Sequence, residues 1–218
     1  ALAPRLAGSA TADWDVGWVD RMKRERLAAL EVPVPGLAPH RVVQIARDLT
    51  PIGAIATVDA GAHMFPVTAY WHAVEPGECL ISNGLATMGF ALPAAIAAAL
   101  VHPGRRVLCF TGDGGLMMVA AELETAARLG LPILIVVFDD AALSLIQVKQ
   151  EQRGHAGASM RYTGPDFPAL ASAFVYITVI AFQLVREGIR LDFVWPHVLR
   201  TITYPLIFSI PRAFLFGI

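Results

Sequence analysis

The stretch that decides the fold is residues 107–140, VLCFTGDGGLMMVAAELETAARLGLPILIVVFDD. It holds two apolar runs, 107–110 and 133–138, on either side of a segment, 120–129, that favours a helix ended by Gly130. Strands that are apolar throughout are typical of parallel sheets covered on both faces. Strands that alternate with helices of about 10–15 residues indicate βαβ units. The stretch therefore predicts an α/β fold: a doubly wound, mainly parallel sheet with helices on both faces.

The same alternation extends toward the N-terminus. Apolar residues among charges at helical spacing over 13–31 indicate a helix, and three prolines in the segment that follows mark a linker. Beyond the linker we expect helices over 41–49 and 87–101, and short strands over 54–58 and 79–81.

The glycine-rich segment Thr111–Gly115 follows directly after the first apolar run. Glycines allow a backbone to approach a phosphate closely, so a strand that ends in glycines before a helix suits an anion. A carboxylate there would repel a bare diphosphate, and Asp113 makes sense if Mg²⁺ lies between the two. The alternative is that Gly-Asp-Gly-Gly forms only a tight turn, because Gly and Asp dominate turns.

A second carboxylate strengthens the metal interpretation. Asp140 stands 27 positions (140 − 113) after Asp113, at the end of the second apolar run. Parallel strands separated by one helix place both side chains at the carboxyl edge of the sheet, where open α/β sheets bind ligands. One cation could then bind Asp113, Asp140, a backbone carbonyl and two phosphate oxygens.

These segments resemble a known family. GDGGLMM followed by FDDAALSLI is similar to the thiamine-diphosphate (ThDP) motif, which runs from Gly-Asp-Gly to an Asn or Asp about 27 residues later. Residues 82–95, SNGLATMGFALPAA, resemble the Ser-Gly-Gly-Leu-Gly-Thr-Met-Gly-Phe-Gly-Leu-Pro-Ala-Ala segment of acetolactate-synthase-like enzymes, and 59–63 resemble their Gly-Gln-His segment. The resemblance covers about residues 40–174 and implies the pyrophosphate-binding domain of a ThDP-binding fold.

The resemblance implies roles for individual residues. It assigns Mg²⁺ to the side chains of Asp113 and Asp140 and to the carbonyl of Ala142. It implies ThDP contacts from Gly61, His63, Asn83, Gly84, Leu85, Met88, Gly112, Asp113, Gly114, Gly115, Asp140, Ala142, Leu143 and Leu145. Among these, Gly112, Gly114 and Gly115 would offer backbone to the diphosphate, and His63 a polar contact. Met88 would lie beneath the cofactor, as an adaptable side chain against aromatic rings.

Three positions qualify the match. Asp140 stands where the family often has Asn, which keeps the metal ligand but adds charge. Ala62 replaces Gln, so one diphosphate contact is in doubt. Glu122 matches a family Glu, and we interpret it as a structural helix residue.

The implied activity is that of a 2-keto acid decarboxylase or carboligase, a lyase or transferase acting on a substrate such as pyruvate. The family's catalytic Glu resides in a separate pyrimidine-binding domain, and the active site forms between two subunits. We therefore expect no catalytic residue in this chain, no turnover by the chain alone, and a homo-oligomer in the full-length protein. The alternatives are a non-catalytic module serving assembly or regulation, and a membrane-attached fusion product.

Charge and composition also bear on whether the chain binds nucleic acid, in which compartment it resides and whether it spans a membrane. The net charge of −1 gives no electrostatic footprint for nucleic acid, and Cys79 and Cys109 follow no disulfide or metal pattern, which fits a reduced cytoplasm. The N-terminus has no signal-peptide pattern, and the missing initiator Met indicates a start within a longer protein. Residues 79–104 and 167–185 lack charged side chains, but polar residues and Pro93 in the first stretch disfavour a membrane span.

We expect three segments: the end of a preceding domain with its linker (1–38), the ThDP pyrophosphate-binding domain (39–174) and an atypical hydrophobic tail (175–218). The tail is rich in Ile, Phe and Tyr, whereas the preceding region is rich in Ala and Gly. We expect it not to complete the sheet in the family's way and to pack poorly. A degenerate final strand over 204–210, a frameshift, a gene-fusion join and unrelated sequence remain alternatives.

Overall fold

The structure is a computed structural model that describes residues 15–31, 36–156, 159–174 and 179–183. Helix α2 (Val16–Ala29) belongs to one compact unit, residues 1–33, and the remaining elements belong to a second unit, residues 34–218. The second unit contains α3 (Pro39–Asp48), β1 (Ile55–Val58), α4 (Met64–Tyr70), β2 (Cys79–Ile81), α5 (Ala91–Val101), β3 (Val107–Gly112), α6 (Asp113–Met118), α7 (Glu122–Arg128), β4 (Ile133–Asp139), α8 (Ser144–Gln152), α9 (Phe167–Ala173) and β5 (Val179–Gln183).

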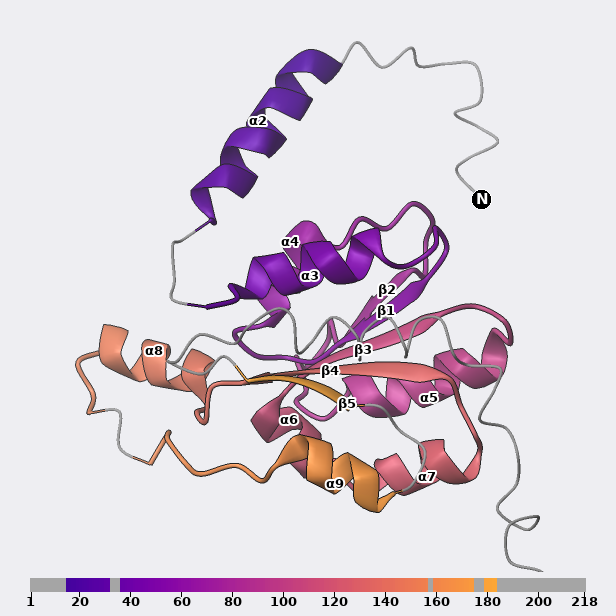
Figure 1. Cartoon of the computed structure of the whole chain (residues 1–218). Coiled ribbons are helices and arrows are strands. Elements are labelled where there is room, and N and C mark those ends of the chain that lie inside the picture. Colours follow the sequence, from indigo (N-terminus) through magenta and orange to yellow (C-terminus); the bar gives the residue numbers. More distant parts are fainter. Residues whose placement is uncertain (1–14, 32–35, 157–158, 175–178, 184–218) are drawn as a thin grey trace, which may run out of the picture. The chain divides into compact units, whose positions relative to one another are not determined.

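A five-stranded sheet organises the second unit (Figure 1). The strand order is β2-β1-β3-β4-β5, and every pair is parallel. Helices α3 and α4 lie on one face of the sheet, and α5, α6, α7 and α9 lie on the other. The predicted doubly wound parallel sheet with helices on both faces is confirmed.

Residue alternation along the strands produces two separate cores. Successive side chains of a strand point to opposite faces of the sheet. In β4, Leu134, Val136 and Phe138 pack with α3 and α4, while Ile133, Ile135 and Val137 pack with α5, α7 and α9. Both faces are thus buried, which explains why the central strands are apolar at every position.

The predicted helix over 87–101 begins later than expected, at Ala91. The backbone N–H groups of residues 89–91 donate to the Asp59 side chain, and this fixes where the helix starts. The short helix α4 was not predicted: its sequence, MFPVTAY, contains Pro66, which is tolerated because it lies in the first turn.

The expectation for the tail is wrong at residues 179–183, where the chain adds a fifth strand parallel to β4. The β-branched residues there, Val179 and Ile180, favour a strand over a helix. The alternative strand over 204–210 lies outside the described residues.

A cluster of polar and aromatic side chains, named here the amino-end cluster, lies where the strands begin; it comprises Arg47, Trp71, Glu78 and Arg105. Glu78 accepts hydrogen bonds from the backbone N–H groups of Val74 (2.7 Å) and Glu75 (3.1 Å). Arg105 pairs with Glu78 at 3.3 Å and donates to the carbonyl of Gly53 at 2.6 Å.

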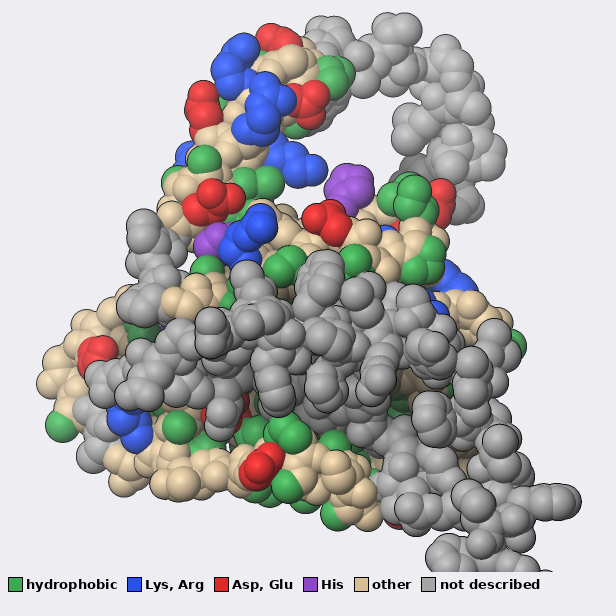
Figure 2. Space-filling view, viewed as in Figure 1, with side chains coloured by type: hydrophobic (Ala, Val, Ile, Leu, Met, Phe, Trp, Pro, Cys, Tyr) green, Lys and Arg blue, Asp and Glu red, His purple; other side chains and the backbone are tan. Residues whose placement is uncertain are grey.

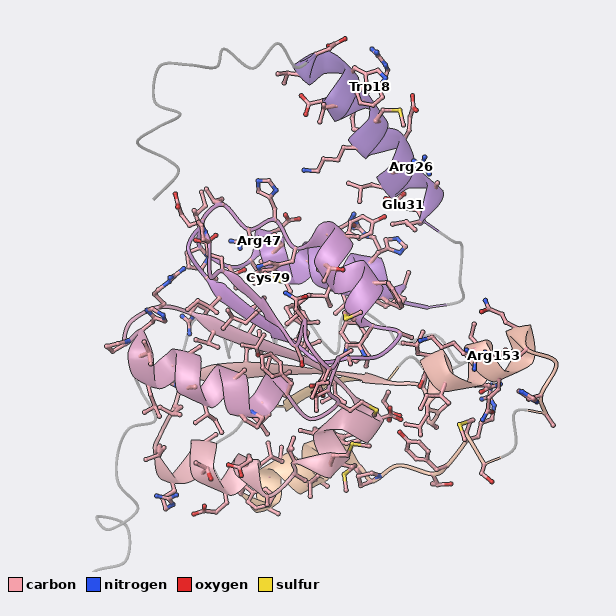
Figure 3. The ribbon with its side chains drawn as sticks, turned by 180° about the vertical axis from the view of Figure 1, so that it is seen from behind. Trp18, Arg26, Glu31, Arg47, Cys79 and Arg153 are labelled. Atoms are coloured by element: carbon pink, nitrogen blue, oxygen red, sulfur yellow. The ribbon has the colours of Figure 1, made fainter. Side chains whose placement is uncertain are left out.

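The aromatic residue of the amino-end cluster, Trp71, also has partners within the cluster. The indole N–H of Trp71 donates to the carbonyl of Glu78 at 3.3 Å, and the Arg47 guanidinium lies 4.5 Å from the Trp71 ring centroid. Figure 3 shows Arg47 at the end of α3, near Cys79 at the start of β2. The cluster joins the loops that precede β1, β2 and β3.

Helix α2 has no buried residue, a property that it shares with α8 of the second unit. Asp15 caps its first turn by accepting from the N–H of Trp18 at 2.8 Å. Side chains of both charges cover it (Figure 2). The predicted helix over 13–31 is confirmed, with observed bounds of 16 and 29.

Of the helices in the described ranges, none combines the length and the apolar character that crossing a membrane requires. The uncharged stretch 79–104 instead divides into β2, a loop and the 11-residue helix α5.

Candidate functional site at the carboxyl ends of β1, β3 and β4

The strand order reverses between β1 and β3. From β1 the chain runs to β2 on one side, whereas β3, β4 and β5 follow on the other side. Ligands of open α/β sheets bind outside the carboxyl ends of the strands where the order reverses in this way. Asp59 follows β1 at this point, and Gly112 and Asp113 follow the core of β3.

Asp59 is a fully buried carboxylate, and both of its oxygens accept hydrogen bonds from other groups of the chain. It accepts from the backbone N–H groups of Gly89 (3.1 Å), Phe90 (2.6 Å) and Ala91 (2.8 Å), and from the hydroxyl of Thr111 (2.8 Å). It therefore ties β1 to the start of α5 and to the residue before Gly112. The sequence analysis quoted Asp59 but missed this role, because its partners lie 30 or more positions away.

The glycines of the Gly-Asp-Gly-Gly segment are required by close packing. A Cβ atom on Gly115 would lie 2.2 Å from the Asp59 Oδ2 atom, and one on Gly112 would lie 3.2 Å from the His63 ring. A Cβ on Gly114 would lie 2.8 Å from the Tyr162 hydroxyl, 2.9 Å from Leu143 and 3.4 Å from Met88. The segment is thus more than a tight turn: side chains from four distant parts of the chain converge on its backbone.

Asp113 is buried, with 3% of its surface exposed, and only one of its carboxylate oxygens is satisfied. Oδ1 accepts from the Gly114 N–H at 2.8 Å, whereas Oδ2 has no hydrogen-bond partner among the described residues. Burial and the charges of Asp140 and Asp139 raise the pKa of Asp113 to about 6, against the Gly114 N–H and the nearby Tyr162 hydroxyl, which lower it. An unsatisfied buried carboxylate is costly without a partner, so a cation fits this position.

The segment after β4 brings two further carboxylates toward Asp113. Asp139, the last residue of β4, is buried and accepts from the N–H of Ala141 at 3.2 Å. Asp140 is exposed and accepts a short hydrogen bond from the Ser144 hydroxyl. Ala141 has a positive φ of 54°, an uncommon conformation for a residue with a side chain, and it precedes the buried Ala142.

His63 is the second buried side chain at the site with an unsatisfied atom. It stacks on Phe138 at a centroid distance of 5.5 Å, and its Nε2 has no hydrogen-bond partner. Burial lowers the pKa of His63 to about 4, against the charge of Asp59, so its imidazole is neutral at pH 7. The ring lies between Gly61 and Gly112, since Cβ atoms there would lie 2.7 Å and 3.2 Å from it.

The structure therefore brings together most of the predicted site residues, including Gly61, His63, Met88, Gly112, Asp113, Gly114, Gly115, Asp140 and Leu143. Asn83, Gly84 and Leu85 are exposed in the loop between β2 and α5, and Leu85 is 91% exposed. Leu145 is half-buried in α8. The structure shows where the predicted residues lie, and the cofactor contacts of all of them stay predictions.

Within the described ranges, no three His, Cys, Asp or Glu side chains are grouped so as to hold a metal. The predicted ligand set does not need three, because Mg²⁺ is usually bound by one or two carboxylates together with phosphate oxygens and water. The unsatisfied Oδ2 of Asp113 and the neighbouring charge of Asp140 are the features that fit such an ion.

The fold is thus a parallel α/β sheet with a glycine-rich segment and a buried, unsatisfied carboxylate at its switch point, the place where open α/β sheets bind ligands. The family model described as "Thiamine pyrophosphate enzyme, C-terminal TPP binding domain" matches residues 59–190. The chain belongs to this family, and the resemblance inferred from its motifs is confirmed.

Comparisons with individual proteins agree with this family assignment. The chain is 35% identical over 136 residues to acetolactate synthase of Bacillus subtilis (strain 168), covering 62% of this chain and 24% of the relative. It is 35% identical over 175 residues to acetolactate synthase isozyme 1 large subunit of Escherichia coli (strain K12), covering 79% of this chain and 31% of the relative. The chain thus spans about a quarter to a third of the length of these relatives.

A solved structure shows the same fold. The thiamine diphosphate-dependent 4-hydroxybenzoylformate decarboxylase of Rhodococcus jostii RHA1 superposes with a TM-score of 0.61 at 22% identity, covering 66% of this chain and 28% of that chain. The chain is a ThDP-binding C-terminal domain of the acetolactate-synthase-like enzymes.

Proposed function

We propose that this domain binds the diphosphate end of ThDP through Mg²⁺, as one part of a 2-keto acid decarboxylase or carboligase. The observation that carries the proposal is the buried Asp113 Oδ2 atom without a partner, within the family's Gly-Asp-Gly motif. Asp113, Asp140 and the carbonyl of Ala142 would hold the metal. The glycine backbone at 112–115 and the neutral His63 would contact the diphosphate.

The chain's own residues contribute binding and position. Met88 and Leu143 present apolar atoms at Gly114, where they would exclude water from the metal and the phosphates. When bound, ThDP supplies an electron sink for loss of CO₂ from a 2-keto acid. We propose pyruvate as the substrate because the relatives are acetolactate synthases, and a homo-oligomer as the full-length protein.

The test compares two carboxylates of the same segment by calorimetric titration of the purified chain with ThDP and Mg²⁺. Asp113→Ala should abolish Mg²⁺-dependent binding, because the unsatisfied acceptor is lost. Glu122→Gln should leave binding nearly unchanged: Glu122 is the half-buried first residue of α7. Equal losses in the two variants would show that Asp113 is not the metal ligand.

The chain alone should catalyse no pyruvate consumption, because the resemblance implies that the family's catalytic Glu belongs to a separate pyrimidine-binding domain, whereas the matching family model is the C-terminal TPP binding domain. Measurable turnover with ThDP and Mg²⁺ would contradict this assignment. The second candidate, a non-catalytic module, would be favoured if the chain bound no ThDP in the titration above.

A further inference from the structure

The segment Met160–Tyr162 is attached to the loop that follows β4. The Leu143 N–H donates to the Met160 carbonyl at 2.8 Å, and the Tyr162 N–H donates to the Ala141 carbonyl at 3.0 Å. Ala142 and Arg161 form an antiparallel bridge between these two bonds. The pairing fixes Tyr162 relative to Ala142, a residue proposed above to bind the metal.

The side chain of Tyr162 reaches the Gly-Asp-Gly-Gly segment. Its hydroxyl lies 2.8 Å from the position that a Cβ atom on Gly114 would occupy, next to Leu143 and Met88. The hydroxyl oxygen is buried, yet it makes no hydrogen bond of good geometry to the described part of the chain. Buried phenol hydroxyls normally find a partner; here the Asp113 carboxylate lies close, and a cation bound to that carboxylate would leave the hydroxyl free to donate to a ligand.

The unsatisfied Oδ2 atom of Asp113 is its neighbour. The two groups are close enough that each alters the pKa of the other. Their polarities differ: a carboxylate oxygen attracts a cation, whereas a phenol hydroxyl can donate a hydrogen bond to an anion. A cation and an anion bound together, as in a magnesium diphosphate, would satisfy both atoms at once.

We propose that Tyr162 is a diphosphate-binding residue, whose hydroxyl donates a hydrogen bond to a phosphate oxygen of the ligand held at residues 112–115. This inference rests on the proposed function, and it adds a contact that neither the sequence motifs nor the family resemblance assigned. Tyr162 lies 49 positions (162 − 113) after Asp113, and the bridge between Ala142 and Arg161 brings it back to the site.

The experiment titrates the full chain with Mg²⁺ plus inorganic pyrophosphate, with Mg²⁺ plus ThDP, and with Mg²⁺ alone, and follows each by protein NMR because that method measures weak binding. The variant is Tyr162→Phe, which removes only the hydroxyl. The control is Tyr70→Phe, the same change at a ring that lies 5.5 Å from the His40 ring. Thermal unfolding of both variants checks that the fold is retained.

Tyr162→Phe should weaken binding of both magnesium diphosphates by about 10-fold or more, the usual effect of one hydrogen bond to a charged group. Binding of Mg²⁺ alone should stay unchanged, and Tyr70→Phe should match the parent chain in all three titrations. An equal loss for Mg²⁺ alone would overturn the proposal, because Tyr162 would then act through Asp113.

Two other outcomes separate this proposal from the proposed function. If Tyr162→Phe binds magnesium pyrophosphate as tightly as the parent while Asp113→Ala does not, the role of Tyr162 is refuted and the metal site stands. If the parent chain binds neither pyrophosphate nor ThDP in the presence of Mg²⁺, both proposals fail.

Discussion

The two ends of the sheet carry polar clusters that differ in how their hydrogen bonds are satisfied. In the amino-end cluster, Glu78 accepts two backbone N–H groups and pairs with Arg105, and the Trp71 indole is also bonded. At the carboxyl end, three buried atoms have no hydrogen-bond partner in the part of the chain that the structure describes: Asp113 Oδ2, His63 Nε2 and the Tyr162 hydroxyl oxygen.

The difference distinguishes polar groups whose hydrogen bonds are made within the protein from buried groups whose partners the described chain does not supply. Satisfied polar clusters stabilise a fold, whereas unsatisfied buried groups lower its stability unless a ligand completes them. Asp59 and Asp113 show the contrast one strand apart: Asp59 accepts four hydrogen bonds, and Asp113 accepts one of good geometry.

The largest loss of stability is expected for Gly115→Ala, which places a new atom against Asp59, the carboxylate whose hydrogen bonds are made within the protein. The new Cβ would lie 2.2 Å from Asp59 Oδ2, an atom held by two hydrogen bonds, so the whole bonded group must shift. We expect a loss of about 3 kcal/mol or more in the free energy of unfolding, measured by urea titration. Gly84→Ala is the control because a Cβ there would meet nothing within 4 Å; equal effects would refute the argument.

Asp59→Asn should cost about 2–3 kcal/mol of stability at neutral pH, measured in the same way. The side-chain amide would place its NH₂ group against the N–H of either Gly89 or Phe90 and Ala91, and one set of donors would lose its acceptor. A change of less than a few tenths of a kcal/mol would mean that these bonds do not fix the start of α5.

Asp113→Asn makes the same substitution at a carboxylate with an unsatisfied oxygen. We expect it to raise the free energy of unfolding, whereas Asp59→Asn lowers it. Because the folded chain raises the pKa of Asp113 from 3.8 to about 6, its contribution to stability is present below pH 3.8 and lost as the pH rises through 6. The neutral Asn should therefore stabilise the ligand-free domain by about 1–2 kcal/mol at pH 7 and have little effect at pH 3.5. Destabilisation at pH 7 would show that Asp113 already has a protein partner.

Glu78→Gln should give the smallest change in stability. Its pH dependence should be the reverse of that expected for Asp113→Asn. The N–H groups of Glu75 and Val74 hold the pKa of Glu78 below its usual 4.5, and Arg105 and Arg47 act in the same direction. The stabilisation that ionised Glu78 gives the folded chain is therefore present above pH 4.5 and is lost as the pH falls through the lowered pKa. Thermal unfolding should show a lower Tm for the variant at pH 7 and a smaller difference in acid.

The sequence predicted those parts of the fold that depend on local pattern. The apolar runs at 107–110 and 133–138 became β3 and β4, and the Gly-Asp-Gly motif placed Asp113 correctly at the end of β3. The start of α5 was missed because it depends on Asp59, which lies outside the helix. Tyr162 was missed for the same reason: a bridge near Ala142, across a separate helix, brings it to the site.

The bridge between Ala142 and Arg161 also makes the intervening segment a candidate for exchange. Helix α8 lies within this segment and has no buried residue, and Figure 3 shows Arg153 at its outer end. Since the two ends are fixed by backbone pairing, changes of length or sequence after Leu145, beyond the site residues, need not alter the positions of Ala142 and Tyr162. For protein engineering, this segment is the natural place to graft a loop from a related enzyme while the rest of the domain stays constant.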